Sequence, residues 1–398
     1  MIAHLPSTQP SAPHDILVAG AGAVGLAAAL ALARAGWRVA LVGRVDARRT
    51  GQTIALLDGS LRFLASLGLG GALEGLGARL KVMRIIDDTG GIFRAPQVEF
   101  RAEEIGLEAF GRNVEACDLV AALADALRAH PNCTQFQTDV TAFTFQTGAP
   151  RATLAAGAPL AARLIVGADG RKSLARRSAG IAQRDWTYPQ AALTAILSHH
   201  APHEGASTEI HTREGPFTLV PLRPVPEAPH RSSLVWMMDP AKAKRRAGLD
   251  DGALAGEIED QCQSMLGEMR CEGPRGLWPI SGSLAKAMTA PRLALVGEAT
   301  HSFPPIGAQG LNLSLRDVKG LTEALGPPGS DPGSAEGLTA YAQGRLADVH
   351  LRSFAVDALN RSLLTHFMPL DLARGVGLSA LGAIGPLRRA AMRMGLAG

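Results

Sequence analysis

The stretch "DILVAGAGAVGLAAALALARAGWRVALVG", residues 15–43, sets three glycines between two short apolar runs. The first run, residues 16–19, predicts a buried strand, and the Ala/Leu-rich segment after it predicts a helix to about residue 35. Gly36 ends that helix, and residues 38–42 predict a second strand. The three glycines therefore lie in the turn between a strand and a helix.

These glycines, Gly20, Gly22 and Gly25, form the pattern G-x-G-x-x-G. The first permits a tight turn, the second lets a pyrophosphate approach the backbone, and the third lets the helix pack closely on the strand. The helix start, with Ala23 and Val24, offers unpaired N–H groups to phosphate charge. The order of strand, glycines, helix and strand predicts a Rossmann-like dinucleotide-binding unit.

The end of the second strand departs from this pattern. An acidic side chain is expected there to accept hydrogen bonds from ribose hydroxyls, but the sequence has Gly43. Either another group, such as Arg44 or a water molecule, holds the adenosine end, or the cofactor binds weakly. Both interpretations stay open at this point.

A second apolar strand runs into a glycine-containing loop in "ARLIVGADGRKSLARRSAGI", residues 162–181. Residues 164–166 form the predicted strand, Asp169 and Gly170 follow it, and a short helical stretch with Ser173 and Arg176 comes next. An Asp-Gly pair after a strand is by itself a common turn. A role in binding therefore needs further support.

A third strand and loop occur in "PRLALVGEATHSFPPIGAQGLNLSLRD", residues 291–317. The strand runs into Gly297 and Glu298, and a loop rich in Pro and Gly then leads into a helix expected to begin near Leu311. His301 is either a structural histidine at the corner between strand and loop or an acid/base group. We therefore assign no catalytic residue from the sequence.

Composition limits the function classes. The 398 residues exceed one typical domain, 46% are hydrophobic, and the net charge is +4. No stripe of Lys and Arg interleaved with aromatic residues predicts nucleic acid binding. The four cysteines have no metal-type spacing, so we expect no metal site and a reducing cytoplasm. The start reads as a flexible tail, and no segment has the ~18 apolar residues of a spanning helix.

The three loops together resemble a known family. The glycine loop, G-A-D-G at 167–170, G-E-A-x-H at 297–301 and P-x-x-G-x-Q-G-x-N at 304–312 have the order and rough separations of the flavoprotein aromatic hydroxylases. The sequence is similar to the single-component FAD-dependent monooxygenases of the para-hydroxybenzoate hydroxylase fold. The likeness extends from about residue 15 to the C-terminus.

Within that family the sequence most resembles the ubiquinone-biosynthesis hydroxylases of the UbiH/UbiF type. The segments that carry this narrower likeness are "MRIIDDTGGIFRAPQVEFRAEEIGLEAFGRNVE" at 83–115, "GPFTLVPL" at 215–222, "PPIGAQGLNLSLRD" at 304–317 and "LNRSLLTHFMPLD" at 359–371.

The resemblance implies a role for each loop. The glycine loop would hold the FAD pyrophosphate, Asp169 and Gly170 would lie near it, and Glu298 would replace the commoner Asp that binds the ribityl chain. Two residues depart from the pattern, namely Gly43 and Ala116, where many relatives have a polar residue near the cofactor. The residues implied to bind FAD are Gly20, Gly22, Ala23, Val24, Gly25, Asp169, Gly170, Gly297, Glu298, Pro304, Gly307, Gln309, Gly310, Leu311 and Asn312.

The resemblance also implies an activity, namely hydroxylation of a polyprenylated phenol in ubiquinone biosynthesis through a C4a-hydroperoxyflavin, with O2 as a substrate. One glycine-rich dinucleotide loop, without a second Rossmann unit, indicates that NAD(P)H binds transiently or that a partner protein supplies electrons. A helix N-terminus near Leu311 would favour the anionic reduced flavin. The protein is then expected in the cytoplasm or at the inner face of the membrane, with other quinone-biosynthesis proteins as candidate partners.

Two other functions stay open from the sequence. One is hydroxylation of a small soluble aromatic compound, and the other is a flavin-poor scaffold of a quinone-synthesis complex, which Gly43 and Ala116 keep in view. A flavin-dependent halogenase is disfavoured because the element W-x-W-x-I is absent.

The expected architecture is an α/β (α+β) protein with a Rossmann-like FAD-binding domain, an inserted, mostly antiparallel sheet and a C-terminal helical region. Short alternating strands over residues 181–288 predict the sheet. The expected parts are a tail at 1–14, a discontinuous FAD-binding domain at 15–80, 113–180 and 289–325, a substrate-binding sheet at 81–112 and 181–288, and a linker with helices at 326–398.

Two groups of residues keep alternative roles. Phe217, Trp236, Met237 and Met238 either line an apolar pocket for a prenyl tail or belong to the core. The last stretch, residues 378–398, combines apolar residues with three arginines. It either lies on an anionic membrane surface as an amphipathic helix, packs on the body of the protein or contacts a partner.

Overall fold

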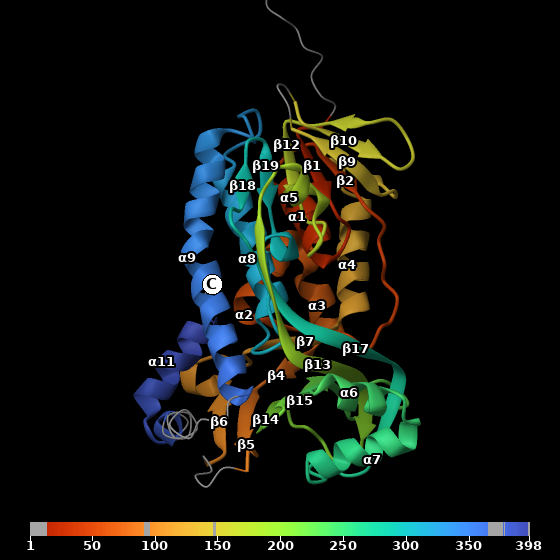
Figure 1. Cartoon of the computed structure of the whole chain (residues 1–398), viewed down its shortest axis with the longest axis vertical. Helices are drawn as coiled ribbons and strands as arrows, with labels where there is room; N and C mark the ends of the chain where they lie inside the picture. Colours follow the sequence, from red (N-terminus) through yellow and green to blue (C-terminus); the bar gives the residue numbers. More distant parts are fainter. Residues whose placement is uncertain (1–13, 91–95, 146–148, 365–376, 378, 397–398) are drawn as a thin grey trace, which may run out of the picture.

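The computed structural model describes residues 14–90, 96–145, 149–364, 377 and 379–396. Figure 1 shows an upper and a lower part, joined by the long strands β13 (Gln183–His199) and β17 (Met269–Ala285), with helix α9 (Ala335–Leu364) running beside both. The tail predicted for residues 1–14 lies outside the described residues except for its last position, as does residue 365 onward of the segment 359–371.

The upper part is built on a six-stranded sheet. Its neighbouring strands are parallel except for the pair β18–β19. Every residue of β1 and β2 is buried, as expected for parallel strands covered on both faces. The strands in spatial order are β18 (Thr289–Ala290), β19 (Leu293–Leu295), β12 (Leu164–Gly167), β1 (Ile16–Ala19), β2 (Val39–Val42) and β8 (Cys133–Phe136).

Alternate side chains of β1 enter two cores, because successive residues of a strand point to opposite faces. Ile16 and Val18 pack against helices, whereas Leu17 and Ala19 pack against a small three-stranded sheet and a short helix. The helices of the first face are α1 (Ala23–Arg34), α4 (Ala116–Arg128) and α8 (Gln309–Ala324); the second face is covered by β9 (Val140–Thr144), β10 (Arg151–Leu154), β11 (Leu160–Ala161) and α5 (Leu174–Ser178).

The lower part is built on an eight-stranded sheet, in which every pair is antiparallel except β14–β5. Helices α6 (Pro240–Ala247) and α7 (Asp251–Gln261) cover one of its faces. The mixed α/β class with a mostly antiparallel second sheet is confirmed. The strands in order are β20 (His301–Ser302), β17, β13, β16 (Arg231–Met238), β15 (Gly215–Leu222), β14 (Ala206–Thr212), β5 (Val82–Asp87) and β6 (Val98–Arg101).

A third small sheet and several short helices complete the body. The sheet has the order β3 (Thr53–Leu57), β7 (Gly111–Glu115) and β4 (Ala78–Leu80). The helices are α2 (Asp58–Leu64), the π-helix η1 (Ala65–Leu69), α3 (Gly70–Leu76) and the 3-10 helices η2 (Ala102–Ile105) and η3 (Gly297–Ala299).

The C-terminal helix α11 (Gly385–Leu396) packs on the body of the protein. Met392 is buried against Phe110, and Arg388 forms an ion pair with Glu104 at 2.7 Å. This contact agrees with one of the roles left open for the segment. Within the described ranges, no helix combines the length and apolarity that crossing a bilayer requires.

Candidate functional site

Three loops meet at one edge of the upper sheet. Strands β1, β12 and β19 are neighbours and parallel, so the loops after their carboxyl ends lie side by side, which is where open α/β sheets bind ligands. A Cβ built on Gly20 would lie 2.3 Å from the carbonyl oxygen of Ala168, and one on Gly297 would lie 3.0 Å from Cγ1 of Val24. The three predicted loops are thus brought together.

In the glycine loop after β1, neighbouring backbone leaves no space for a side chain at Gly20 or Gly25. Gly20 has φ +108°, and a Cβ on Gly25 would lie 1.8 Å from the carbonyl oxygen of Gly20. Apart from its chain neighbours, no atom of the described residues lies within 4 Å of a Cβ built on Gly22. The space beside Gly22, at the start of α1, is therefore free of protein atoms and is suited to a phosphate.

Gly43 closes this loop from the second strand. It has φ +153°, and a Cβ here would lie 2.7 Å from the backbone nitrogen of Ala21. An acidic side chain at position 43 would therefore push the backbone of the glycine loop aside. Arg44 is mostly exposed and pairs with Asp139 at 3.2 Å, so it lies near the loop but is already engaged.

Asp169 acts in a turn and also has an unused oxygen. Its Oδ2 accepts hydrogen bonds from the backbone N–H groups of Leu174 at 2.7 Å and Ala175 at 3.0 Å, at the start of α5. Its Oδ1 is buried and has no hydrogen-bond partner in the part of the chain that the structure describes. A buried acceptor without a donor is costly, so this atom points to a ligand group with a hydroxyl or N–H. Gly170 has φ +76° and open space beside it.

The third loop presents the N-terminus of α8. Glu298 is exposed in the turn after β19. The helix begins at Gln309, two residues before the predicted start, and its N-cap residue Ala308 has the left-handed φ of 55°. Within the described residues no side-chain cap hydrogen bond is found at this end, which leaves the first amides of the helix open to a ligand. A Cβ on Gly310 meets no atom within 4 Å, which leaves room in front of them.

Asn312 belongs to the same turn, but its side chain is fully occupied. Its Oδ1 accepts from the backbone N–H of Leu57 at 2.9 Å, and its Nδ2 donates to the carbonyls of Ala55 at 2.8 Å and Ala308 at 2.5 Å. The side chain ties strand β3 to the loop and is not available to a cofactor. Any contact of Asn312 with FAD is thus left to its backbone. Leu311 is partly buried against the upper core.

His301 is a buried structural residue. Its exposed fraction is 1%, and Nε2 lies 2.6 Å from Oδ2 of Asp317, which is itself fully buried. The ring stacks on Phe303. This arrangement agrees with the structural interpretation of His301.

A cleft of about 340 Å³ lies between the lower sheet and these loops. Among its described lining residues, Arg171 is the one ionisable side chain; it donates hydrogen bonds to Ser281 Oγ and the carbonyl of Gly282. Ala116 also lies in the wall. The lining residues are Gly51, Gln52, Thr53, Ile54, Ala116, Arg171, Ala192, Thr194, Leu234, Val235, Trp278, Pro279, Ile280, Ser281, Ser302, Phe303, Pro304 and Pro305.

Most residues of this wall carry no signal in the sequence. Phe217, Trp236, Met237 and Met238 are buried in the cores, with exposed fractions of 2% or less, and do not line the cleft. The core interpretation of these four residues is therefore the right one. The lining side chains of β13, β16 and β17 carry no motif, and only the alternation of apolar residues marked them as strand.

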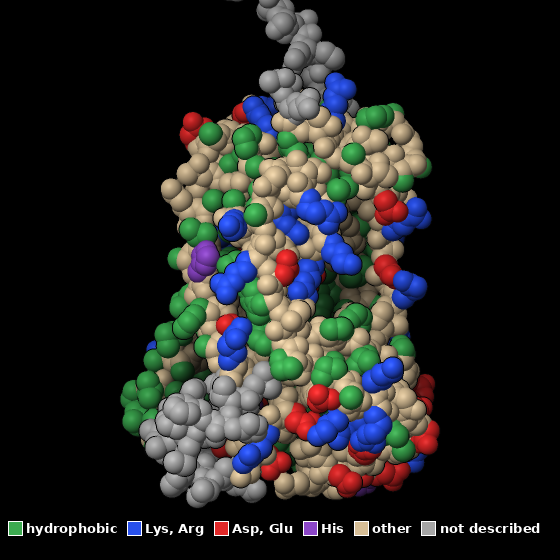
Figure 2. Space-filling model, in the orientation of Figure 1, with side chains coloured by type: hydrophobic (Ala, Val, Ile, Leu, Met, Phe, Trp, Pro, Cys, Tyr) green, Lys and Arg blue, Asp and Glu red, His purple; other side chains and the backbone are tan. Residues whose placement is uncertain are grey.

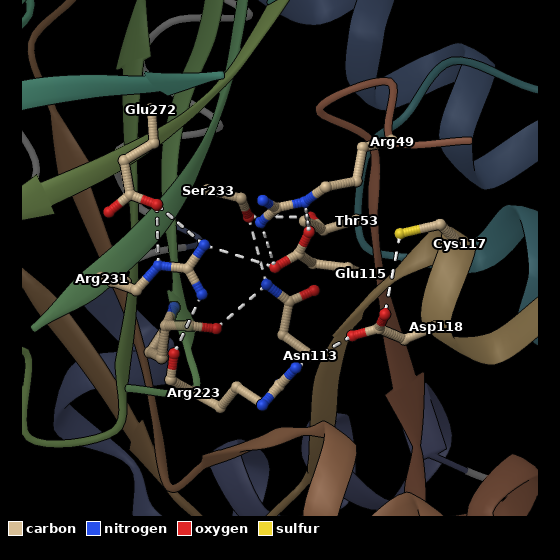
Figure 3. Close-up of polar contacts among 11 residues, drawn as sticks. Arg49, Thr53, Asn113, Glu115, Cys117, Asp118, Arg223, Arg231, Ser233 and Glu272 are labelled. Atoms are coloured by element: carbon tan, nitrogen blue, oxygen red, sulfur yellow. Dashed lines mark hydrogen bonds and ion pairs between the residues drawn. The ribbon is translucent and has the colours of Figure 1, made fainter. Parts of the chain in front are cut away.

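A buried polar cluster joins the third small sheet to the lower sheet next to the cleft (Figure 3). Arg231 of β16 is 1% exposed and lies between two carboxylates, Glu115 at 3.3 Å and Glu272 at 2.8 Å. Arg49 binds the other side of Glu115 at 2.8 Å. Burial raises the pKa of Glu115, but the hydrogen bonds and charges of Arg49 and Arg231 outweigh it and hold that pKa below its usual range.

Asn113 and Thr53 extend this cluster to the cleft. Both side chains bond to Ser233 Oγ, at 3.1 Å and 2.8 Å, and Asn113 also donates to the carbonyl of Pro221. Thr53 is part of the cleft wall. The cluster therefore fixes one wall of the cleft relative to the lower sheet.

Comparison with known proteins places this chain in a family. A sequence profile described as FAD binding domain matches residues 14–351. Ubiquinone hydroxylase UbiL of Rhodospirillum rubrum is 34% identical over 396 residues, which cover 95% of this chain and 88% of that protein. The 3-demethoxyubiquinol 3-hydroxylase of Escherichia coli K12 is 29% identical over 395 residues, which cover 96% of this chain and 98% of that protein.

A solved structure shows the same fold. The p-nitrophenol 4-monooxygenase of Pseudomonas putida superposes with a TM-score of 0.80 at 16% identity, covering 98% of this chain and 99% of that one. FAD fits the residues found here, because the edge of the upper sheet offers a glycine cradle, an unpartnered buried oxygen of Asp169 and an uncapped helix N-terminus. The chain belongs to the FAD binding domain family and is an FAD-dependent aromatic-ring monooxygenase.

Proposed function

We propose that this protein hydroxylates the aromatic ring of a polyprenylated phenol in ubiquinone biosynthesis. The observation that carries the substrate class is the wall of the cleft, which is apolar along the sheet and includes Trp278 of β17, 39% exposed. A phenol ring fits a cleft of about 340 Å³, and exposed apolar side chains suit a tail that extends from it. Relatives named as ubiquinone hydroxylases support this substrate class.

We further infer which residues hold FAD. Gly20, Gly22, Ala23, Val24 and Gly25 would hold the pyrophosphate, with Asp169 and Gly170 beside it, because these loops meet at one edge of the sheet. Gly297 and Glu298 would hold the ribityl chain. Pro304 and Gly307 would run beside the flavin ring, and the backbone amides of Gln309, Gly310, Leu311 and Asn312 would face its negative edge.

When bound, FAD would accept electrons from NAD(P)H or a partner protein and activate O2 for transfer of one oxygen atom to the ring. The protein contributes position and electrostatics. The positive end of α8 favours negative charge at the flavin edge, and Arg171 places a cation in the cleft wall, which suits a phenolate oxygen. Apolar side chains of β13 and β16 keep water from the ring.

The proposal is tested by deleting the gene and identifying quinone intermediates by mass spectrometry. An unhydroxylated prenylated phenol should accumulate and disappear when the wild-type gene is restored. Normal ubiquinone in the deletion strain would refute the biosynthetic role. The purified protein should also bind FAD and oxidise NAD(P)H, or electrons from a reductase, faster with a prenylated phenol than with the same phenol lacking its tail; the reverse order would indicate a small soluble substrate.

We also propose that the protein touches the membrane through the outer face of its C-terminal helices. Six of the eight large apolar side chains most exposed among the described residues lie on α9 or near α11. Figure 2 shows green side chains gathered at the lower left, where Figure 1 places α11 and the lower end of α9. The six are Leu346, Leu351, Phe354, Ile384, Leu387 and Met394.

Sedimentation with vesicles tests this contact. Vesicles with anionic lipid should carry down the wild-type protein, because Arg389 and Arg393 belong to the same helix as Leu387 and Met394. The triple variant Ile384→Ser, Leu387→Ser and Met394→Ser should bind several-fold less, whereas Arg128→Ala, on the exposed end of α4, should not change binding. Equal binding of the triple variant would exclude this face.

A further inference from the structure

Asp317 is a fully buried carboxylate on α8 that gathers donors from three parts of the chain. Its Oδ2 accepts a hydrogen bond from the backbone N–H of Gly297 at 3.1 Å and lies 2.6 Å from Nε2 of His301. Its Oδ1 accepts from Nε of Arg345 at 3.0 Å. One side chain therefore joins α8, the turn after β19 and helix α9.

From Arg345 the contacts continue along α9 and return to the first residue of α8. Arg345 Nη1 donates to Asp348 Oδ2 at 2.8 Å, and Arg352 Nε donates to Asp348 Oδ1 at 2.7 Å. Arg352 Nη1 then donates to Oε1 of Gln309 at 2.8 Å. We call this set, from Asp317 to Gln309, the α8–α9 charge network. It begins behind the Gly297 turn and ends at the N-terminus of α8.

Further contacts of neighbouring residues hold the Gly297 turn in its position beside Asp317. Gly297 has φ +62°, and a Cβ there would lie 3.0 Å from Val24 Cγ1 and 3.2 Å from Ser314 Oγ. The Thr300 hydroxyl donates to the carbonyl of Gly297 at 2.7 Å, and Ser314 Oγ donates to that of Gly310 at 2.8 Å. The position of the turn and that of the first helical turn are therefore coupled.

The energetics favour a geometric role for this carboxylate. Burying an ion pair costs desolvation energy that the attraction of its partners barely offsets, and apolar side chains at such a place are often as stable. A buried carboxylate with three separate donors fixes angles and distances that apolar packing leaves looser. His301 supplies one of the donors. Since a carboxylate only accepts, a hydrogen is on Nε2, and Nδ1 of the ring has no partner among the residues that the structure describes.

We propose that Asp317 is a positioning residue for FAD, which sets the Gly297–Glu298 turn and the N-terminus of α8 at the spacing that the cofactor needs. In this role His301 is a hydrogen-bond donor to Asp317 and moves no proton. The proposal rests on the assignment of these two segments to FAD. Its test measures FAD affinity, which does not depend on the identity of the aromatic substrate.

The main variant is Asp317→Asn, because an amide has one acceptor oxygen and cannot serve Gly297, His301 and Arg345 together. Protein stripped of flavin is titrated with FAD, followed by quenching of flavin fluorescence, at a temperature below the unfolding transition of every variant. The Kd should rise at least about tenfold, as for the loss of hydrogen bonds to a buried charge, and the visible absorption band of the bound flavin should shift. Asp125→Asn, at an exposed pair with Arg128, is the matched control with an unchanged Kd.

Variants of His301 separate positioning from packing. His301→Gln keeps an N–H donor toward Asp317 and should bind FAD more tightly than His301→Phe, which fills the space without a donor. Equal Kd values for these two variants would overturn the proposal, as would wild-type affinity and absorption in Asp317→Asn.

If Asp317→Asn does not fold, Arg352→Met is measured instead, since it cuts only the outer end of the network. Its Kd should then rise about threefold, and an unchanged value would overturn the proposal. Failure of the wild-type protein to bind FAD would refute the assignment of the site itself.

Discussion

Gly310 illustrates how much one residue decides at this site. It lies in the first turn of α8, where a Cβ would meet no protein atom within 4 Å, so a larger side chain would enter the space assigned to the flavin without disturbing the fold. Gly310→Leu should therefore keep the thermal stability of the flavin-free protein but lose FAD binding or reduction. Gly344→Leu, at an equally open helical glycine on α9, is the control. Normal flavin content and turnover in Gly310→Leu would contradict the placement.

His199 is expected to lower the free energy of unfolding as the pH becomes mildly acidic. The ring is 7% exposed and lies 2.8 Å from the carbonyl of Ala201 and 3.0 Å from Ser232 Oγ. Burial, with His203 and His230 nearby, lowers the pKa of His199, and burial also lowers that of His203. The unfolded chain then binds protons first, so this contribution is complete above the ordinary pKa of about 6.5 and is lost as the pH falls below it.

Urea unfolding between pH 7.5 and pH 5.5 checks this expectation. The free energy of unfolding should fall with decreasing pH, and the fall should be shallower in the double variant His199→Gln, His203→Gln. His350→Gln, at an exposed histidine, should keep the wild-type slope. An identical slope in the double variant would show that other groups cause the acid loss.

At the scale of elements, Asn312 joins strand β3 to helix α8. Removing its side chain leaves the buried N–H of Leu57 and the carbonyl of Ala55 without their partner. Asn312→Ala should therefore lower the free energy of unfolding by about 2–3 kcal/mol and weaken FAD binding, because the first turn of α8 loses its anchor. Asn132→Ala, which removes one bond to the carbonyl of Ala33, should cost about 1 kcal/mol. Denaturant titration measures both, and equal losses would argue against a special role for Asn312.

The elements also show what the sequence can and cannot predict. Strand β1, the loop of Gly20 to Gly25 and helix α1 are contiguous, so their motif predicted them well. The cleft wall was not predictable in this way. Thr194 of β13 and Val235 of β16 both line the cleft because they are paired residues on neighbouring strands that lie far apart in the sequence. Apolar alternation marks the two faces of a strand but not which face borders the cleft.

The network around Asp317 was missed for a similar reason. His301 was noticed, but its partner lies sixteen residues later and the counter-charge Arg345 lies on another helix. No spacing rule connects such residues, since only the packing of α9 on α8 brings them together. The direction of the Asn312 side chain was not predictable either: it turns to β3, so the predicted contact of this residue with the cofactor would come from its backbone.

At the scale of the whole molecule, Arg231 joins the third small sheet to the lower sheet. It lies between Glu115 of β7 and Glu272 of β17 with an exposed fraction of 1% (Figure 3). Arg231→Met would leave both carboxylates without this partner, and we expect a loss of about 3–5 kcal/mol in the free energy of unfolding. Arg231→Lys keeps the charge without the planar fork and should fall between. Arg270→Met, at an exposed pair with Glu268, should change stability by less than about 1 kcal/mol. Calorimetry of the wild-type protein and the three variants measures these changes in the free energy of unfolding. Wild-type stability in Arg231→Met would mean that packing alone joins the two sheets.

The neighbour of β12 in the upper sheet has a consequence for how the protein is made. Strand β19 pairs with β12 but is synthesised only after the entire lower sheet up to β17. While the ribosome adds those residues, β12 is an unpaired edge strand of an apolar sheet. Such an edge can pair with strands of other chains. Release of β19 and α8 completes the sheet and the cofactor loops in one step. Nascent chains are therefore expected to need chaperone protection until residue 324 of 398, the end of α8, has been translated.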